Sequence, residues 1–352
     1  MRKVLTVLLV VFILILLTGV GAAAAIYYFN SPLPSAGEGP LPFTIRDGES
    51  LSSVARRLES ENIIRWSKYL VGLSKLRGTE TSFQKGSYLV PRGKTTEEIH
   101  DFFLTGSQVL VRITIPEGWA LRRTAAAFEE KNICTAEDFL AAAANKKLLE
   151  ALGIPAPTAP VPSAPVPSAL GYLYPDTYLF PEDFPADRVI TEMVANFRSK
   201  VADIYPDAAS LDAKELHDKV TLASIVEREY RIVEEAPLMA SVFYNRLGIR
   251  MALGSCATVE YIITEILNRP HPGYLTYSDL EIPSPYNTYR HAGLPPGPIS
   301  NPGGTALKSV FYPANTDYWY FVLKDPRQGT HHFSKNIDEH NRARVLYLKR
   351  VS

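Results

Sequence analysis

A glutamate occupies an apolar position in an otherwise amphipathic segment. In TLASIVEREYRIVEEA, residues 221–236, an apolar stripe with the i, i+3, i+4 spacing of a helix begins at Leu222, and its next position is Glu229. At about 100° per residue Glu229 lies within the stripe, whereas Glu227 lies outside it and is predicted to face water. A carboxyl group among apolar neighbours resists ionisation, so its pKa rises and suits a general acid near neutral pH. Periodicity alone slightly favours the alternative, a structural glutamate paired with an arginine such as Arg246.

The segment SPYNTYRHAGLPPGPISNPGG, residues 284–304, is dense in Pro, Gly, Asn and Tyr. This composition predicts a long ordered loop, and such loops tend to be functional. Asn and Thr supply neutral hydrogen bonds and Tyr supplies flat apolar faces, a mixture that suits a sugar. A purely structural loop held by its prolines is the alternative.

The segment YWYFVLKDPRQGTHHFS, residues 318–334, predicts a β-hairpin with strands at 318–323 and 331–334. Histidines in and after this hairpin raise the question of a metal site: His331, His332 and His340. No acidic or cysteine ligand stands at characteristic spacing, so a polar hydrogen-bonding role is expected and no metal site is predicted. The sequence implies no cofactor.

The composition excludes several classes of function. The 352 residues include 37 basic and 37 acidic side chains, so the zero net charge gives no support for a nucleic-acid partner. The sequence contains no G-x-S-x-G and no phosphate-binding glycine loop, so a serine nucleophile of that type and nucleotide use have no support. Cys134 and Cys256 form no zinc or redox motif and are predicted to be buried small apolar residues.

The N-terminal segment predicts a membrane anchor. Residues 4–29 carry no charge and are mainly apolar, and as a helix they would extend about 39 Å, enough to span a bilayer with some tilt. Arg2 and Lys3 place the N-terminus in the cytoplasm by the positive-inside rule. A cleaved signal peptide is the alternative, but the apolar run is longer than a usual h-region. Either way, the chain after residue 30 is predicted to be exported.

Two similar segments follow a Pro/Gly/Ser-rich spacer at residues 31–42. TIRDGESLSSVARRLE (residues 44–59) and TIPEGWALRRTAAAFE (residues 114–129) align without a gap, and each predicts a strand, a turn and an amphipathic helix. Between them lie another predicted strand and a helix whose start, Thr95 to Glu98, fits a capping box. The unit resembles the LysM domain, a glycan-binding module. A generic α+β spacer that binds nothing is an equally open alternative.

The remaining chain divides at a low-complexity segment, IPAPTAPVPSAPVPSA, which reads as an extended linker. The sequence therefore predicts an α+β fold with an N-terminal transmembrane helix, a small LysM-like α+β domain and a mixed α/β catalytic domain. The predicted bounds are 1–30 for the cytoplasmic tip and anchor, 31–42 for a linker, 43–153 for the LysM-like region, 154–169 for a second linker and 170–352 for the catalytic domain.

Taken together, these segments resemble the endolytic murein transglycosylase family, also called YceG-like or MltG. The resemblance runs over most of the chain. It rests on the anchor and on the ordered motifs KGSY, TIPEG, GYLYPDTY, LASIVEREY, ASVFYNRL, SPYNTY, GLPPGPISNPG, YFV, THHFS and EHN. The resemblance implies an inner-membrane, single-pass enzyme with most of the chain outside the cytoplasm. Its implied partners are peptidoglycan glycan strands and the membrane, and a link to cell-wall synthases is expected from the family alone.

The family resemblance also implies a reaction and its residues. One glutamate protonates the glycosidic oxygen and then acts as base while the muramic acid 6-hydroxyl closes a 1,6-anhydro ring, so a single carboxylate suffices, whereas a hydrolase usually needs two. The second glutamate of the family motif maps onto Glu229, the residue that the helical stripe selects. The residues expected to bind substrate are Asn287, Thr288 and Tyr289 on the loop, with Tyr178, Asn245, Arg246 and His332 as further cleft candidates.

Three departures from the family pattern leave alternatives open. Tyr230 follows the glutamate where a small residue is usual, Leu170 stands where a glutamate is common, and LGSCATV (residues 253–259) replaces an LQSDPTV-like segment, with Cys256 in place of aspartate. A membrane-tethered scaffold protein with an impaired site is therefore one alternative. Another is a muramidase that uses Glu229, water and a second carboxylate such as Asp176.

Overall fold

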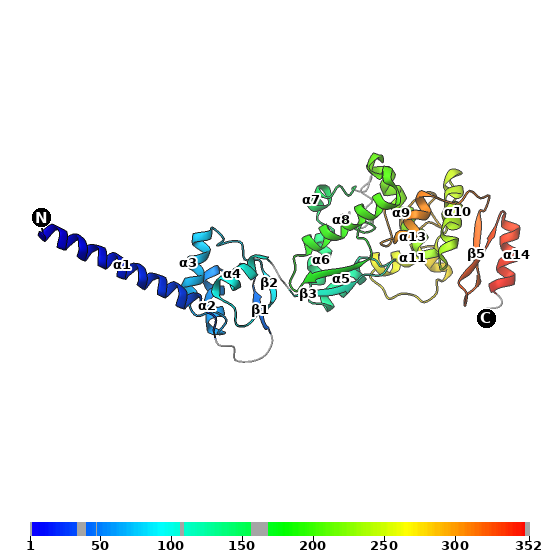
Figure 1. Ribbon diagram of the computed structural model, residues 1–352. Coiled ribbons are helices and arrows are strands. Elements are labelled where there is room, and N and C mark those ends of the chain that lie inside the picture. The colour runs from blue at the N-terminus through cyan, green and yellow to red at the C-terminus, as the bar shows by residue number, and fades with distance from the viewer. Residues whose placement is uncertain (1, 34–39, 47, 106–108, 156–167, 349–352) are drawn as a thin grey trace. The chain divides into compact units, whose positions relative to one another are not determined.

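The computed structural model describes residues 2–33, 40–46, 48–105, 109–155 and 168–348 (Figure 1). The described residues form a mixed α/β structure with small sheets. The chain divides into two compact units, of which the first comprises residues 1–111 with 181–183 and the second comprises residues 112–180 with 184–352.

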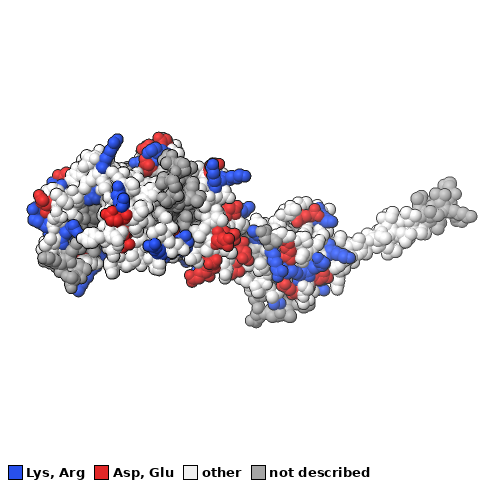
Figure 2. Space-filling view, turned by 180° about the vertical axis from the view of Figure 1, so that it is seen from behind, with Lys and Arg blue, Asp and Glu red and all other residues white. Residues whose placement is uncertain are grey.

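The first element is α1 (Arg2–Asn30). Its segment Leu9–Asn30 has a mean hydropathy of 2.8 and is the one described helix that is long and apolar enough to cross a membrane. This segment is white in Figure 2 because it carries no charged side chain. Elsewhere on the face shown there, basic and acidic side chains are interspersed.

After α1, the described residues of the first unit form two antiparallel strands and three helices. Phe43 pairs with Tyr88 in the ladder between the strands, and both side chains are buried with Leu58, Leu70 and Phe103. The predicted capping box is present, because Thr95 N–H donates to Glu98 (2.8 Å) and Glu98 N–H donates to Thr95 (3.1 Å). The elements are β1 (Leu41–Ile45), α2 (Leu51–Ser60), α3 (Ser67–Arg77), β2 (Gly86–Val90) and α4 (Thr96–Thr105).

Helices dominate the second unit, with a strand pair at one end of its sequence and a hairpin near the other (Figure 1). Its first part comprises most of β3 (Leu110–Thr114) and β4 (Thr177–Pro181), whose outer residues belong to the first unit, with α5 (Leu121–Glu130), α6 (Ala136–Ala143), α7 (Lys146–Ala151), α8 (Ala186–Ile204) and α9 (Ala213–Glu229). Its second part comprises α10 (Ala236–Gly248), α11 (Cys256–Tyr261), α12 (Tyr277–Leu280), α13 (Gly304–Phe311), β5 (Tyr320–Asp325), β6 (Thr330–Ser334) and α14 (Ile337–Leu348). Short 3₁₀ turns cover Pro206–Ser210 and Val233–Glu235, and one π turn covers Ile262–Ile266.

The second repeat-like segment packs in the second unit. Phe128 of α5 stacks on Phe139 of α6 at 5.1 Å between ring centroids and lies 5.9 Å from Phe180 of β4, while α6 contacts α8. Residues 112–153, which the sequence assigns to the LysM-like region, therefore share a core with α8. The boundary between compact units lies at residue 111, well before the predicted linker at 154–169, most of which is outside the described residues.

Two predicted features of the second unit lie near the candidate glutamate. The hairpin is present as antiparallel β5–β6, and it lies between α10 and α14 (Figure 1). The helical segment predicted from 221 onward does not continue to 236: α9 ends at Glu229, and Tyr230 is extended (φ −73°, ψ 150°). The glutamate thus lies at the C-terminus of a helix, with α11 and α13 packed against that helix.

Candidate active site

The apolar stripe of α9 is buried as its periodicity predicts. Leu222, Ile225 and Val226 are at most 1 % exposed, and they anchor the helix in the core of the second unit. The same helix holds the loop 284–304, because Ser224 Oγ accepts a hydrogen bond from Ile299 N–H (3.0 Å). The rigid helix therefore fixes both Glu229 and the loop that the sequence singled out.

Glu229 is partly buried, and its carboxylate faces a second helix. Ser255, the residue before α11, donates its hydroxyl hydrogen to Glu229 Oε1, and the backbone N–H of Ala257 also donates to the carboxylate. Burial raises the pKa of Glu229, and the charge of Glu260 raises it further, against the lowering effect of the Ser255 hydroxyl. The position at the helix C-terminus acts in the same direction as burial, since the negative end of the helix dipole disfavours a carboxylate. These conditions suit a carboxylic acid that delivers a proton near neutral pH.

The loop residues Asn287 and Thr288 are buried, and Thr288 holds the backbone around Ser255. Thr288 Oγ1 accepts from Ser255 N–H (3.0 Å), and Thr288 O accepts from Gly254 N–H (3.0 Å). Asn287 Nδ2 donates to the carbonyls of Leu280 and Ile282, each at 2.9 Å. Thr288 therefore positions Ser255, the residue that contacts Glu229, whereas Asn287 fixes the fold of its own loop, and neither side chain faces the surface.

Glu229 lines a cleft of about 720 Å³, referred to below as the Glu229 cleft. Tyr289 and Arg246, two of the predicted substrate-binding residues, also line it. Arg246 is fixed from behind, because its guanidinium donates to the carbonyls of Trp319 and Leu253, and it lies over the ring of Tyr320 at 5.2 Å. Other lining residues come from β5, β6, α11 and α14, among them Glu260, Tyr320, His331, His340 and Arg344. The cleft thus combines one acid of raised pKa with aromatic faces and several guanidinium groups, a surface suited to a polar sugar chain.

Three other predicted substrate-binding residues have structural partners and are not among the lining residues of the Glu229 cleft. Tyr178 Oη donates to Tyr174 O (2.6 Å) and accepts from Asn196. Asn245 Nδ2 donates to the carbonyls of Thr316 and Tyr318, each at 2.9 Å. The ring of His332 packs against that of Tyr347, at 5.6 Å between centroids.

Several cleft residues were not selected from the sequence. His331, the neighbour of the predicted His332, faces the cleft, and its Nδ1 lies 2.7 Å from Glu235. Alternation along a strand places neighbours on opposite faces, but the pattern alone does not say which face is the cleft. In the sequence, α10 separates Ser255 and Glu260 from Glu229, so only the folded structure brings them together. Glu260 Oε2 is held by Arg228 at 2.9 Å.

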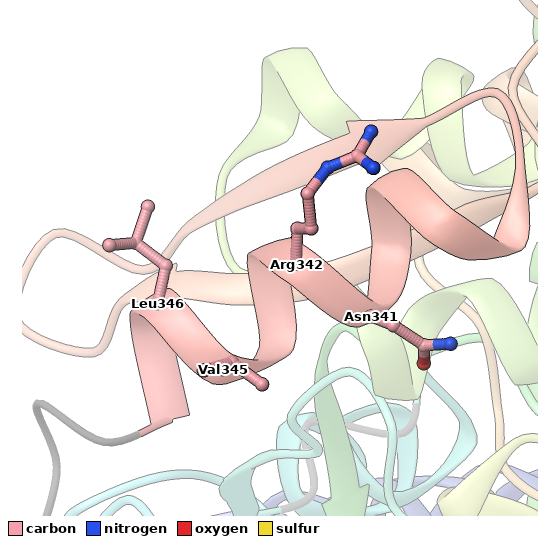
Figure 3. A pocket seen from close by; sticks show the side chains of 4 residues that line it. All are labelled: Asn341, Arg342, Val345 and Leu346. Atoms are coloured by element: carbon pink, nitrogen blue, oxygen red, sulfur yellow. The ribbon is translucent and has the colours of Figure 1, made fainter.

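A second hollow runs along α14, and the described residues that line it all belong to that helix (Figure 3). Arg342 and Leu346 project on one side of the helix and Asn341 and Val345 on the other. None of these described lining residues carries a carboxyl group, so they do not share the acid chemistry of the Glu229 cleft.

A sequence model of the YceG-like family matches residues 43–345. The chain belongs to the YceG-like family. A Bacillus subtilis relative named endolytic murein transglycosylase is 31% identical over 310 residues, which cover 86% of this chain and 84% of the relative.

More distant and structural relatives agree with this membership. A Streptococcus pneumoniae protein of the same name is 28% identical over 314 residues, which cover 85% of this chain but 56% of that longer protein. A crystal structure of a YceG-like protein from Listeria monocytogenes is 31% identical with a TM-score of 0.58, and the match covers 87% of this chain and 99% of that one. The YceG-like relatives thus match both compact units.

Two departures from the YceG-like pattern lie in the wall of the cleft. The predicted burial of both cysteines is wrong for Cys256, which is exposed, while Cys134 is half-buried. Cys256 begins α11 at a cleft position where the resemblance places an aspartate, and its Sγ lies 3.1 Å from Tyr289 Oη. Gly254 has φ +60°, a left-handed conformation that favours glycine. Neither substitution removes the hydroxyl that contacts Glu229.

The expectation that Glu227 faces water is also wrong. Glu227 Oε2 accepts from Gly303 N–H (2.9 Å) at the N-terminus of α13, and Tyr230 is hydrogen-bonded to both Glu227 and Thr305. Burial raises the pKa of Glu227 to about 7, and the nearby charge of Glu117 adds to this effect. The periodicity of α9 defined only its own apolar stripe, and the loop before α13 covers the adjacent face as well. Tyr230, another departure from the family pattern, thus has a structural role beside Glu227.

Proposed function

We propose that this protein is an endolytic lytic transglycosylase. It cleaves the MurNAc–GlcNAc bond within peptidoglycan glycan strands, forms 1,6-anhydroMurNAc ends and acts on nascent wall as a terminator of glycan elongation. The observation that carries the proposal is the carboxyl group of Glu229, with its raised pKa, in a cleft with aromatic and guanidinium walls. Relatives that bear the name endolytic murein transglycosylase support the same activity.

In this proposal Glu229 acts twice. Its acid form protonates the glycosidic oxygen as the bond breaks, and the resulting carboxylate then accepts the proton of the muramic acid 6-hydroxyl as the anhydro ring closes. Ser255 orients the carboxylate through its hydrogen bond, and Thr288 holds Ser255 in turn. The aromatic rings of Tyr289 and Tyr320 supply flat faces for the sugar rings.

The muramidase alternative requires a second carboxylate for water. Asp176, the candidate from the sequence, is not among the cleft residues and instead accepts from Thr177 N–H (2.7 Å) and Asn196 Nδ2 (3.1 Å). Glu260 is the other carboxylate of the cleft, and its ion pair with Arg228 favours a charge-balancing role. The one-carboxylate route therefore has the better support.

The scaffold alternative rests on an impaired site, and the departures do not impair the groups around Glu229. Tyr230 contacts Glu227 and Thr305, Leu170 is buried at 3 % exposure, and Cys256 is at the cleft wall beside Tyr289. The hydrogen bond from Ser255 to the acid is retained. Activity is therefore favoured over a binding role alone.

Helix α1 and the first unit have separate proposed roles. Helix α1 anchors the protein in the inner membrane, with Arg2 and Lys3 in the cytoplasm and the second unit outside. The first unit serves as a LysM-like glycan-binding module, supported by its strand–turn–helix unit with a core of its own. Cell-wall synthases are its proposed protein partners, on the strength of the family resemblance.

Product analysis tests the activity. The detergent-solubilised full chain is incubated with purified peptidoglycan, and the released fragments are identified by mass spectrometry. Fragments that end in 1,6-anhydroMurNAc support the proposal. Reducing ends would support the muramidase, and a folded protein that binds glycan without releasing fragments would support the scaffold.

A further inference from the structure

The Glu229 cleft carries more positive than negative charge. Of the residues that the structure describes, four arginines and two carboxylates line it, and these arginines are Arg228, Arg231, Arg246 and Arg344. Arg228 is paired with Glu260 at 2.9 Å. Among the described residues, no carboxylate oxygen lies within 4.0 Å of the other three guanidinium groups. The surplus increases further when Glu229 is protonated, as its catalytic role requires.

The three remaining arginines differ in how firmly they are held. The guanidinium of Arg246 donates to two backbone carbonyls, which leave its charge uncompensated. Arg231 follows the end of α9, and its side-chain stem lies against the hairpin turn, because a Cβ placed on Gly329 would be 3.0 Å from Arg231 Cβ. Arg344 comes from α14, and both Arg231 and Arg344 are exposed. These two side chains therefore present their guanidinium groups to a ligand from two separate elements.

His340 also lines the cleft, and the nearby arginines affect its pKa. Its ring stacks on Tyr320, at 5.0 Å between centroids, and its Nδ1 is buried without a hydrogen-bond partner among the described residues. Burial lowers the pKa of His340, and the charges of Arg344 and Arg246 lower it further. A neutral imidazole is thus favoured, so His340 adds a polar ring but no charge to this wall.

We propose that Arg231 and Arg344 bind carboxylates of the stem peptide attached to muramic acid, so that the protein prefers peptide-bearing glycan strands to uncharged ones. The inference rests on the proposed function and names the part of the substrate that this wall recognises. In a peptide-bearing strand the lactyl carboxyl is taken up in an amide bond, and the sugars themselves carry no charge. The free carboxylates lie on the peptide, and planar guanidinium groups match carboxylates in bidentate geometry.

The test compares two substrates that differ only in charge. Uncross-linked, lipid-free peptidoglycan strands are used either unmodified or after amidation of their free carboxyls with carbodiimide and ammonia. Full-length wild type should lose roughly tenfold in kcat/KM on amidation, mostly through KM, and the loss should shrink as salt screens the charges. The double variant Arg231→Gln/Arg344→Gln should be equally slow on both substrates.

Controls separate this inference from the proposed activity. Arg188→Gln, an exposed change on α8 outside the cleft, should behave as wild type, and Arg231→Lys should restore part of the preference. Thermal unfolding shows whether each variant is folded. Equal cleavage of both substrates by wild type, with anhydro ends formed, would overturn the inference and leave the proposed function intact. Absence of anhydro ends from both substrates would instead remove the proposed function.

A third substrate identifies the source of the anion. Strands stripped of peptide by an amidase expose the lactyl carboxylate next to the sugar ring. The proposal expects these strands to be cleaved slowly and with no dependence on Arg231 or Arg344. Retention of the full arginine dependence would assign the interaction to the lactyl carboxylate and overturn the peptide assignment.

Discussion

The carboxyl groups of Glu227 and Glu229 lie at opposite ends of two different helices. Glu229 ends α9, where the helix dipole opposes ionisation, and Glu227 accepts a hydrogen bond at the N-terminus of α13, where the dipole favours it. Burial raises the pKa of both carboxyls. Only Glu229 lines the cleft, which is why it is the proposed acid.

The hydrogen bond from Ser255 gives a pH prediction. The general acid must be protonated, so activity should fall as pH rises through the raised pKa of Glu229. Ser255 favours the carboxylate, and Ser255→Ala should therefore raise the pKa further and move the alkaline limb of kcat/KM to higher pH. Ser210→Ala, whose hydroxyl bonds the Asp207 carbonyl on the surface, is the control. An unchanged limb in Ser255→Ala would contradict the assignment.

Glu227 should affect stability in a pH-dependent way. Its pKa in the folded protein is about 7 against an ordinary value of 4.5, so the folded state binds more protons and stability falls as pH rises between these values. The loss is on the order of 3 kcal/mol at most, and partial exposure to water reduces it. Glu227→Gln should flatten this decline in thermal unfolding between pH 5 and 8. Exposed Glu192→Gln should keep it, and a wild-type profile without the decline would refute the prediction.

From the sequence, the environment of a side chain could be predicted only where the helix that carries it determines that environment. Periodicity placed Glu229 on the apolar face of its helix because that face is formed by residues of α9 itself. It failed for Glu227, whose surroundings come from the loop before α13. The same reason explains Ser255 and Glu260, which reach Glu229 only through packing of α11 on α9. Of the predicted sugar-binding side chains, Asn287 and Thr288 turned out to be buried within the loop that they support.

At the scale of elements, the loop 284–304 is held tightly against its neighbours. Gly171 has φ +88°, and its N–H donates to Asn301 Oδ1 (2.8 Å). A Cβ at this position would lie 2.4 Å from Pro298 Cγ, so the loop could not keep its place. The prolines that predicted an ordered loop thus act through such contacts, while the hairpin β5–β6 was predictable from its own residues.

Gly171→Ala should therefore destabilise the second unit. We expect a loss of roughly 2–4 kcal/mol in unfolding free energy, from the left-handed backbone and the contact with Pro298 together. Gly248→Ala, where an added Cβ meets no atom within 4 Å, should change stability little. Equal stability of the two variants in urea unfolding would contradict the close approach of the loop.

At the scale of the whole molecule, the N-terminus and the second unit are proposed to lie on opposite sides of the membrane that α1 spans. Exposed Cys256 provides a probe of this orientation. In the variant Cys134→Ser, a membrane-impermeant maleimide should label Cys256 in spheroplasts without lysis. Labelling that requires lysis would place the second unit in the cytoplasm and exclude the proposed orientation.

The division into two compact units depends on long-range contacts that local sequence patterns do not reveal. The similar segments at 44–59 and 114–129 suggested one region, yet each helix packs with a different core. Similar local patterns form similar local elements, and only long-range contacts such as Phe128 with Phe180 assign an element to a unit.

The most direct test of the central claim compares Glu229→Gln with Glu227→Gln in the product assay. With full-length protein and peptidoglycan, Glu229→Gln should reduce the release of 1,6-anhydroMurNAc ends by roughly 10²–10⁴-fold, because the acid is lost while the fold is kept. Glu227→Gln should retain most of the release. Substantial anhydro ends from Glu229→Gln, or their loss only in a folded Glu227→Gln protein, would show that Glu229 is not the catalytic acid.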